Sequence, residues 1–530
     1  MKPEKETEAK TIRPELAEMI TRQSFCLDEN RPDATAKRQR KNQRTARANV
    51  EDLCDVGSLI EYGALAIAAQ RGRRSEEDLI SKTPADGLIA GIASVNGSFF
   101  TEEKARCMIM AYDYTVLAGT QGFFNHKKMD RMLKLAHEQL LPLVLFAEGG
   151  GGRPGDVDAI GVMTTGLDLS TFGSFANLSG RVPVIGVVSG PCFAGNAALL
   201  GCCDVIIATE NSNIGMGGPV MIEGGGLGVF KAEEVGPIDV QSKNGVVDIE
   251  VADDAEAVTA AKKYLSYFQG TTSKWDAADQ LRLRDLIPEN HKRAYNVRTV
   301  IKALADTDSF LELRPKFGPG IITGFIRIEG RPFGLIANNC MHMAGAIEAE
   351  GADKAAKLMQ ICQAHGLPIL SLCDTPGFMV GPEIEKRAQV RHVCRMFVIG
   401  SHLTVPYFTV VLRRGYGLGA MAMARGGFHE SFFTAAWPTG EFGAMGIEGA
   451  IKAGFKKELA AIEDPQEREK LYEQLVGELY KRGKAINIAA YLEIDSVIDP
   501  ADTRKWIMQG MKSLPAGKTK ESCHSFVDPW

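Results

Sequence analysis

The chain repeats its own layout, and this repeat constrains its fold more than any other feature. Two apolar runs, each followed by a loop of small residues, occupy residues 141–148 and 182–189. Similar runs with similar loops occupy residues 367–374 and 405–412. Both pairs are separated by about 225 residues, so the register is kept over two strand-and-loop units. The repeat predicts two similar domains, and two similar halves of a site, in one chain.

Short β-branched runs alternate with helical stretches over residues 85–230 and again over residues 300–455. Such alternation is typical of parallel strands joined by crossover helices. Residues 253–269 have the period of an amphipathic helix that ends at a glycine. The sequence therefore predicts an α/β protein with a first domain over residues 1–290 and a second over residues 291–530.

The composition excludes several classes of protein. A net charge of −5 in 530 residues gives no reason to expect a nucleic acid as partner. No apolar run approaches the length of a membrane span, and the first residues lack the apolar core of a signal peptide. The eleven cysteines form no Cys-x-x-Cys pair, and no histidine-rich or carboxylate-rich cluster occurs. We therefore expect a cytoplasmic protein with no metal, no nucleic-acid partner and no membrane partner.

The second run of each half leads into a turn that opens a helix of small residues. We call residues 190–196 the first elbow and residues 413–419 the second elbow. A helix start leaves its first N–H groups unpaired and carries partial positive charge. Small residues let a substrate oxygen approach these groups, as in an oxyanion hole. Tight packing alone could explain one such elbow, but two at matched positions favour anion stabilisation.

Neither elbow has a protein base beside it. No histidine lies within three residues of either elbow, and no Gly-x-Ser-x-Gly motif occurs. We interpret Cys192, in the first elbow, as a small buried filler. The Gly-x-Gly-x-x-Ala pattern of residues 415–420 would suit a dinucleotide, but no acidic residue ends a following strand, so an NAD enzyme is disfavoured. The site therefore suits chemistry that brings its own base.

The basic stretch over residues 37–47 has two interpretations. Its cations could form a solvated helix face, which is the usual meaning of a charge run. Alternatively, some of them could lie against the phosphates of a bound cofactor.

Several segments, in the same order, resemble the carboxyltransferase (β) subunits of biotin-dependent acyl-CoA carboxylases. The similarity covers roughly residues 35–510, and its motifs are residues 86–91, 95–97, 286–288, 374–378, 413–419 and 436–449. The resemblance implies two tandem crotonase-like (ClpP/crotonase) domains, with the acyl-CoA on the first and carboxybiotin on the second. CO₂ would pass from carboxybiotin to the α-carbon, or a vinylogous carbon, of the thioester.

The resemblance also explains the missing base. Biotin's own ureido nitrogen would take the proton, and two enolates would form, so two oxyanion holes are needed. By position, Ala194 and Gly195 would donate N–H groups to the thioester oxygen, and Leu418 and Gly419 to the biotin carbonyl. The other implied contacts are substrate-binding Gly149, Gly150, Gly151, Phe193, Tyr416 and Met421, and a biotin-side loop of Thr375, Pro376, Gly377 and Phe378.

The chain departs from the family pattern at four positions. Leu418 replaces a glycine, which a backbone donor tolerates only at negative φ. Met421 stands where short-chain carboxylases often carry Asp, which favours a less polar or differently shaped acyl group. Glu148 opens a loop that usually begins with Ser, and Asp248 stands where His is usual.

The resemblance implies that biotin comes from a partner chain, because no Ala/Val-Met-Lys-Met attachment motif occurs. A biotin carboxylase or biotin carboxyl carrier subunit and a homo-hexamer are the expected partners. Two alternatives stay open. The chain could belong to a biotin-dependent decarboxylase that runs the chemistry backwards, or it could be a non-catalytic paralogue that scaffolds a carboxylase.

Overall fold

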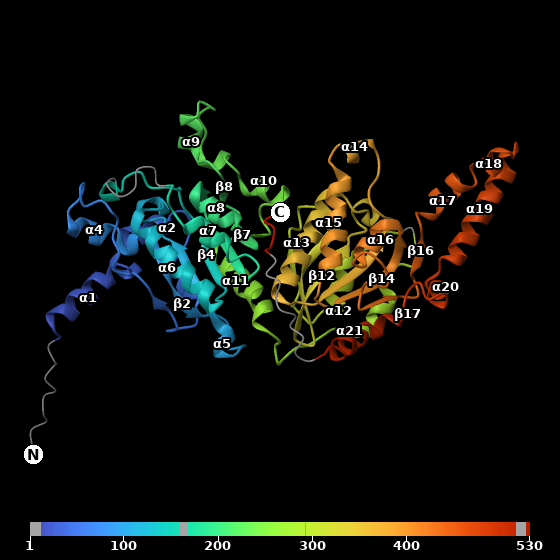
Figure 1. Cartoon of the computed structure of the whole chain (residues 1–530), viewed down its shortest axis with the longest axis horizontal. Coiled ribbons are helices and arrows are strands. Elements are labelled where there is room, and N and C mark those ends of the chain that lie inside the picture. Colours follow the sequence, from blue (N-terminus) through green and yellow to red (C-terminus); the bar gives the residue numbers. More distant parts are fainter. Residues whose placement is uncertain (1–11, 160–166, 292, 516–525) are drawn as a thin grey trace, which may run out of the picture.

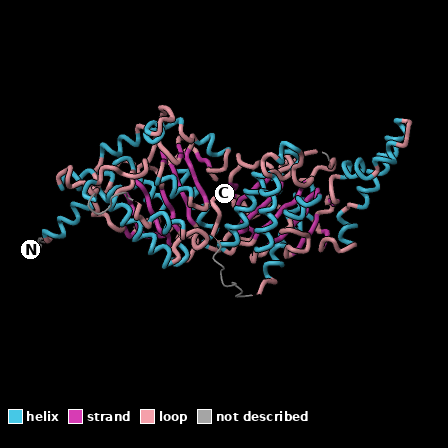
Figure 2. Tube along the Cα trace, turned by 45° about the horizontal axis from the view of Figure 1, so that its top comes forward, coloured by secondary structure: helices cyan, strands magenta, loops and turns pink. Residues whose placement is uncertain are grey.

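Two α/β domains lie side by side along the long axis of the molecule (Figure 1). The structure is a computed structural model and describes residues 12–159, 167–291, 293–515 and 526–530. Each domain is built on its own central sheet, with helices on both faces (Figure 2). Among the described residues, no helix is both long and apolar enough to cross a bilayer.

The two sheets have the same topology. The first runs β1-β2-β3-β4-β5-β7-β9 and the second runs β10-β11-β12-β13-β14-β15-β17, with β16 paired to β14 beside that path. In each, the first three strands are antiparallel and the rest are parallel. The predicted duplication and α/β class are therefore confirmed, strand for strand.

The strands of the first domain are β1 (Ile60–Glu61), β2 (Leu88–Ser94), β3 (Arg106–Tyr112), β4 (Leu143–Phe146), β5 (Val184–Val188), β6 (Pro191–Phe193), β7 (Val205–Thr209), β8 (Asn213–Gly215) and β9 (Ile249–Val251). Those of the second are β10 (Leu311–Leu313), β11 (Ile321–Ile328), β12 (Arg331–Asn338), β13 (Ile369–Thr375), β14 (Tyr407–Tyr416), β15 (Phe433–Ala436), β16 (Glu441–Gly443) and β17 (Ser496–Val497).

The helices repeat in the same way, because α6 and α13 have 17 residues each and α8 and α16 have 7 each. The first domain contains α1 (Pro14–Ser24), α2 (Pro32–Gln39), α3 (Ala46–Leu53), α4 (Glu76–Lys82), α5 (Glu102–Ala105), α6 (Phe123–Gln139), α7 (Thr171–Ala176), α8 (Gly195–Gly201), α9 (Pro219–Gly224), α10 (Ile238–Lys243) and α11 (Asp254–Gln269). The second contains α12 (Val297–Leu304), α13 (Ala349–His365), α14 (Pro382–Glu385), α15 (Gln389–His402), α16 (Gly417–Met423), α17 (Ile447–Gly454), α18 (Lys456–Ala460), α19 (Pro465–Arg482), α20 (Ala485–Ala490) and α21 (Thr503–Lys512).

Helix α11 joins the two halves. The Asp253 side chain caps it by accepting a hydrogen bond from the Glu256 N–H, and Gly270 at φ 120° ends it, as the sequence predicts. Tyr264, Tyr267 and Phe268 of this helix surround the Phe325 ring of β11, with ring centroids 5.2–5.6 Å apart. One hydrophobic core therefore covers a face of both sheets. The boundary near residue 290 stays a prediction.

A buried ion pair also links the halves. Arg314, after β10, donates from Nε to Asp248 Oδ1 over 2.7 Å, and Asp248 Oδ2 accepts the Ile206 N–H over 2.8 Å. Both side chains are almost fully buried. The aspartate that replaces the family's usual histidine is therefore a structural residue in this protein.

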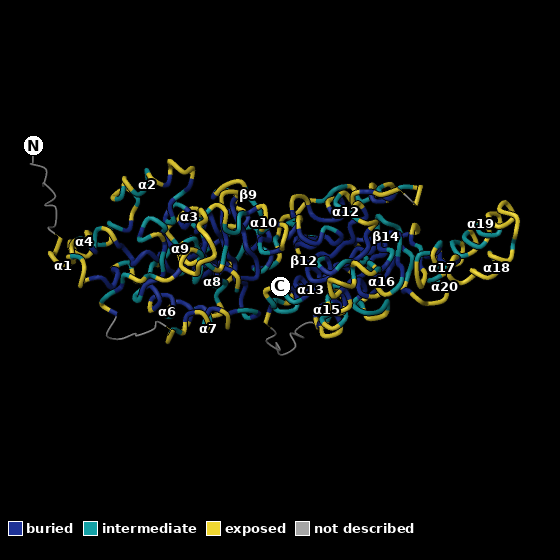
Figure 3. Tube along the Cα trace, turned by 90° about the horizontal axis from the view of Figure 1, so that it is seen from above, coloured by how far each residue is buried: buried dark blue, intermediate teal, exposed yellow. Residues whose placement is uncertain are grey.

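Two arms project from the body. Helices α17, α18 and α19 extend from the second domain beyond β16, and the segment around α9 extends from the first domain beyond β8 (Figure 1). The longer arm is mostly exposed (Figure 3), and only Ile447 and Ile451 of its helices are buried. Each arm begins beside an elbow, because β6 pairs with β8 and β14 pairs with β16.

Candidate active site

The first elbow presents one open amide at the start of α8. Ala194 caps this helix at φ 52°, a conformation that alanine rarely adopts and that often marks functional sites. Its N–H donates to the Gly215 carbonyl over 3.2 Å. The expectation that Ala194 offers a donor is therefore corrected, since β8 already uses that amide. Within the part of the chain that the structure describes, the Gly195 N–H has no acceptor.

The loop that follows β4 packs directly against this elbow. A Cβ on Gly151 would lie 2.6 Å from the Ala194 Cβ, and a Cβ on Gly195 would collide with Gln121 Oε1. Asn196 holds the loop, since its side chain accepts the Gly151 N–H over 2.9 Å and donates to the Gly119 carbonyl over 3.3 Å. The predicted residues Gly151 and Gly195 are therefore adjacent. Asn196 had no sequence signal, because its partners are distant in the chain.

The first three amides of the glycine loop, those of Gly149, Gly150 and Gly151, are engaged. Gly149 donates to the Pro191 carbonyl over 2.9 Å and Gly150 to the Ala118 carbonyl over 3.2 Å. The loop therefore shapes the site through its lack of side chains and not through free donors.

The second elbow presents two open amides. Gly417 takes the positive φ, at 59°, directly after β14, so Leu418 lies inside α16 with helical geometry. The condition that Leu418 has negative φ is met, and its side chain points to solvent with 60% exposure. Neither Leu418 nor Gly419 finds an acceptor for its N–H among the described residues.

The predicted biotin-side loop lies against this second elbow. A Cβ on Gly419 would lie 2.6 Å from the Gly377 carbonyl carbon and 2.9 Å from the Phe378 nitrogen. The Thr375 hydroxyl braces the loop by bonding both the N–H and the carbonyl of Gly377 at 3.1 Å. Only glycine fits at Gly419, because the colliding atoms are backbone, whereas a Cβ at Gly195 would meet the end of the Gln121 side chain. The two elbows thus share one design, a helix start packed against the loop after the neighbouring strand.

A buried charge cluster supports the second loop. Asp374, fully buried at the end of β13, accepts from Arg413 Nε at 3.1 Å and from Arg414 Nε at 2.7 Å. The predicted contact residue Tyr416 is buried beside Glu441, and burial raises the pKa of both side chains. This arrangement fixes β13 and β14 where they meet the elbow.

The remaining predicted contacts lie on either side of the elbows. Phe193 is buried directly before Ala194, and Gly218 packs on its ring. Met421, 37% exposed, lies on α16 two residues after Gly419. Helices α8 and α16 belong to different domains, so a single chain does not place the two elbows in one cavity (Figure 1).

The basic stretch divides between two roles. Arg38 and Arg47 are buried in ion pairs with Glu148 and Glu61. Lys37, Arg40 and Lys41 are exposed, form no ion pair among the described residues, and line a pocket of about 830 Å³ with Arg31, Arg38, Lys82 and Tyr114. Part of the stretch is thus structural, and part is free to meet an anion.

The fold, two duplicated crotonase-like domains in one chain, matches the architecture of carboxyltransferases that act on acyl-CoA thioesters. Residues 37–525 match the family described as the carboxyl transferase domain. The chain belongs to this family, and its resemblance to the β subunits of acyl-CoA carboxylases is confirmed.

Curated relatives of the same length agree with this assignment. The chain is 31% identical over 496 residues to the methylmalonyl-CoA carboxyltransferase 12S subunit of Propionibacterium freudenreichii subsp. shermanii, covering 90% of this chain and 89% of that one. It is 28% identical to the propionyl-CoA carboxylase beta chain of Saccharopolyspora erythraea, covering 94% and 92%.

Two solved structures share the fold over nearly the whole chain. A single-chain, multi-domain long-chain acyl-CoA carboxylase superposes with a TM-score of 0.89 at 56% identity over 94% of this chain. This chain spans about half, 49%, of that longer one. The hexameric transcarboxylase 12S, with methylmalonyl-CoA bound, superposes with a TM-score of 0.81 at 27% identity, covering 97% of this chain and 99% of that one.

Proposed function

We propose that this chain is the carboxyltransferase component of a biotin-dependent acyl-CoA carboxylase. It would move CO₂ from carboxybiotin to the α-carbon, or a vinylogous carbon, of an acyl-CoA. The observation that carries the proposal is the pair of elbows with open amides, at Gly195 in one domain and at Leu418 and Gly419 in the other.

The open amides would each meet an oxygen on which negative charge develops. Donors aimed at a developing oxyanion act on the transition state, and losing one costs on the order of 10²–10³ in rate. The first elbow would bind the thioester oxygen through Gly195, and the second would bind the ureido carbonyl of biotin through Leu418 and Gly419. Biotin, brought by a partner chain, would supply both the carboxyl group and the base.

The pocket beside α2 would hold the phosphates of coenzyme A. Lys37, Arg40 and Lys41 are exposed on its lining and lie in the domain that carries the acyl-side elbow. Cations without protein partners suit a multiply charged ligand. A binding site for methylmalonyl-CoA in transcarboxylase 12S supports coenzyme A thioesters as the substrate class.

A long acyl chain is the substrate that the chain's own departures favour. Met421 places a thioether on α16, where short-chain carboxylases often carry Asp. The 56% identical relative is described as a long-chain acyl-CoA carboxylase. The partners would be a biotin carboxylase and carrier protein, together with further copies of this chain. Further copies of this chain would assemble with it, as in hexameric transcarboxylase 12S. In that assembly, a neighbour's second elbow would face this chain's first elbow.

Carboxyl exchange tests the proposal. Purified chain is mixed with free biotin, labelled carboxylated acyl-CoAs of several chain lengths and the matching unlabelled acyl-CoAs. Biotin-dependent movement of label is the expected result, with the highest rate on long chains. No exchange on any thioester, by a folded oligomer, would favour the scaffold alternative. Bicarbonate fixation driven by ATP in the complete complex would then distinguish carboxylase from decarboxylase.

A further inference from the structure

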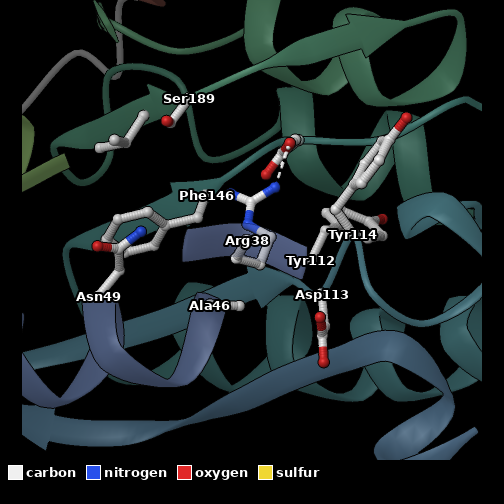
Figure 4. A pocket seen from close by; sticks show the side chains of 10 residues that line it. Arg38, Ala46, Asn49, Tyr112, Asp113, Tyr114, Phe146 and Ser189 are labelled. Carbon is white, nitrogen blue, oxygen red and sulfur yellow. Dashed lines mark hydrogen bonds and ion pairs between the residues drawn. The ribbon is translucent and has the colours of Figure 1, made fainter. Parts of the chain in front are cut away.

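An ion pair buried behind the glycine loop joins the N-terminal helix α2 to the acyl-side elbow. Arg38 is the buried residue of α2, and Glu148 lies between β4 and Gly149. Arg38 Nη1 donates to Glu148 Oε1 over 2.7 Å, with about nine-tenths of each side chain buried. Figure 4 shows Arg38 with Phe146 and Ser189 in the small pocket that the pair lines. The two residues are 110 positions apart, so the contact exists only in the folded chain.

The first elbow is shaped to receive this carboxylate. Gly190 stands at φ 113°, and a Cβ there would collide with Glu148 Oε1. Beside it, Gln43 Nε2 donates to the Ser189 carbonyl over 3.2 Å. Glu148 is therefore held between α2, the loop that it opens and the residues that lead into the elbow.

Arg38 also reaches the cationic pocket. It lines the pocket of about 830 Å³ with Lys37 and Lys41, and it lines a small cavity of about 20 Å³ beside Glu148. Its Nε donates to the Arg44 carbonyl over 2.8 Å, which fixes the guanidinium in one orientation. A shift of α2 would therefore move the pocket and the glycine loop together.

We propose that Arg38 and Glu148 are positioning residues that hold the acyl-side glycine loop in register with the pocket for the coenzyme A phosphates. The inference rests on the proposed function and adds to it two residues that touch neither reacting group. By the resemblance to the family, Glu148 stands where Ser is usual. Because a displacement of about 1 Å can cost 10²-fold in rate, such a link would affect turnover directly.

The contact between α2 and the glycine loop should depend on pH, because it is made through the Arg38–Glu148 ion pair. Burial raises the pKa of Glu148 to about 7, and Arg38 opposes that rise. The other titratable groups that face Glu148 are Asp113, Tyr114, Cys192 and Asp254. Below neutral pH the carboxyl gains a proton and the ion pair is lost, so acyl-CoA binding should weaken there.

A paired substitution tests the link without leaving a lone buried charge. Arg38→Met with Glu148→Met should fold, raise the KM for acyl-CoA by at least about tenfold and remove its rise below pH 7. The KM for biotin should not change. The matched control is Arg47→Met with Glu61→Met, a second buried pair of the same region that does not reach the loop. This control should keep the KM for acyl-CoA within about twofold of wild type.

An unchanged KM and pH profile in the Arg38/Glu148 double variant would overturn the inference. If that variant does not fold, the KM for acyl-CoA and its pH profile are measured on Glu148→Gln instead. This substitution keeps the shape of the side chain and an acceptor for Arg38. A wild-type chain without exchange would instead remove the proposed function. The comparison would then be made by calorimetry with coenzyme A, where equal affinities of wild type and variant would sink the positioning role.

Discussion

At the scale of the residue, glycine matters here for the space it leaves as much as for its backbone. A Cβ at Gly419 would strike the backbone of the opposing loop, and a Cβ at Gly195 would strike the Gln121 side chain. Ala194 adopts a positive φ, a conformation that glycine reaches without steric cost, and it donates its N–H to the Gly215 carbonyl. Each elbow is thus built from main-chain groups that only a small neighbour can expose.

Gly195→Ala should reduce carboxyl exchange by about 10²-fold or more. The new Cβ would displace Gln121 or the start of the helix, so the residue 195 N–H would no longer point at the thioester oxygen. Gly201→Ala, at the other end of the same helix, meets nothing within 4 Å and is the matched control. Exchange rates of both variants are compared with unfolding midpoints. Equal exchange by Gly195→Ala and wild type would remove the first elbow from the reaction.

Met421→Asp should shift substrate preference toward short acyl chains by about tenfold, because a buried methylene stabilises an apolar chain by about 0.8 kcal/mol and a carboxylate repels it. Leu418→Ala is the control, since its side chain points to solvent while its backbone amide is kept. The measurement is kcat/KM over a series of acyl-CoAs. An unchanged chain-length profile for Met421→Asp would show that this residue does not line the acyl pocket.

At the scale of the element, regular structure was predictable and its long-range contacts were not. The spacing of apolar runs located α11, the elbows and the repeated strands, because periodicity and capping are local properties. The sequence marks Glu148 and Asp248 only as departures from the family pattern, because their partners Arg38 and Arg314 lie far away in the chain. The engaged amide of Ala194 depends on β8, which no local pattern reveals.

Helix α13 carries a buried lysine that should make stability depend on pH. Lys354 Nζ donates to the Arg314 and Phe317 carbonyls at 2.8 and 2.9 Å, and burial lowers its pKa to about 7 from an ordinary 10.5. Above pH 7 the unfolded chain therefore binds a proton that the folded chain lacks. The free energy of unfolding should rise with pH through this window, by about 1.4 kcal/mol per pH unit.

Lys354→Met should lose that rise between pH 7 and 8. Lys357→Met, on the same helix, should keep it, because burial lowers the Lys357 pKa only to about 8. Urea unfolding at several pH values measures both. A slope that is the same in wild type and Lys354→Met would show that this amine stays protonated in the folded state.

At the scale of the whole molecule, two copies of one fold are joined by a shared core and by the buried Arg314–Asp248 pair. The aromatic rings of α11 pack around Phe325 and supply apolar contacts between the domains. Arg314 and Asp248 add a hydrogen-bonded ion pair. The duplication places one elbow in each domain, at the starts of α8 and α16 (Figure 1). Assembly with other copies is therefore part of the proposed function.

Asp248→Ala should lower the free energy of unfolding by about 3–5 kcal/mol, because it leaves Arg314 buried without its partner. Asp248→Val combined with Arg314→Met should recover most of that loss. Urea unfolding of the two variants measures the difference. A single variant as stable as wild type would show that water or another residue replaces the carboxylate.

The central claim is that main-chain amides of the two elbows each hold one developing oxyanion. A crystal structure of the assembled protein with acyl-CoA and biotin tests it most directly. We expect the thioester oxygen about 2.7–3.1 Å from the Gly195 nitrogen, and the ureido oxygen at the same range from the Leu418 or Gly419 nitrogen. Oxygens bound instead by side chains, with these amides left to solvent, would contradict the account.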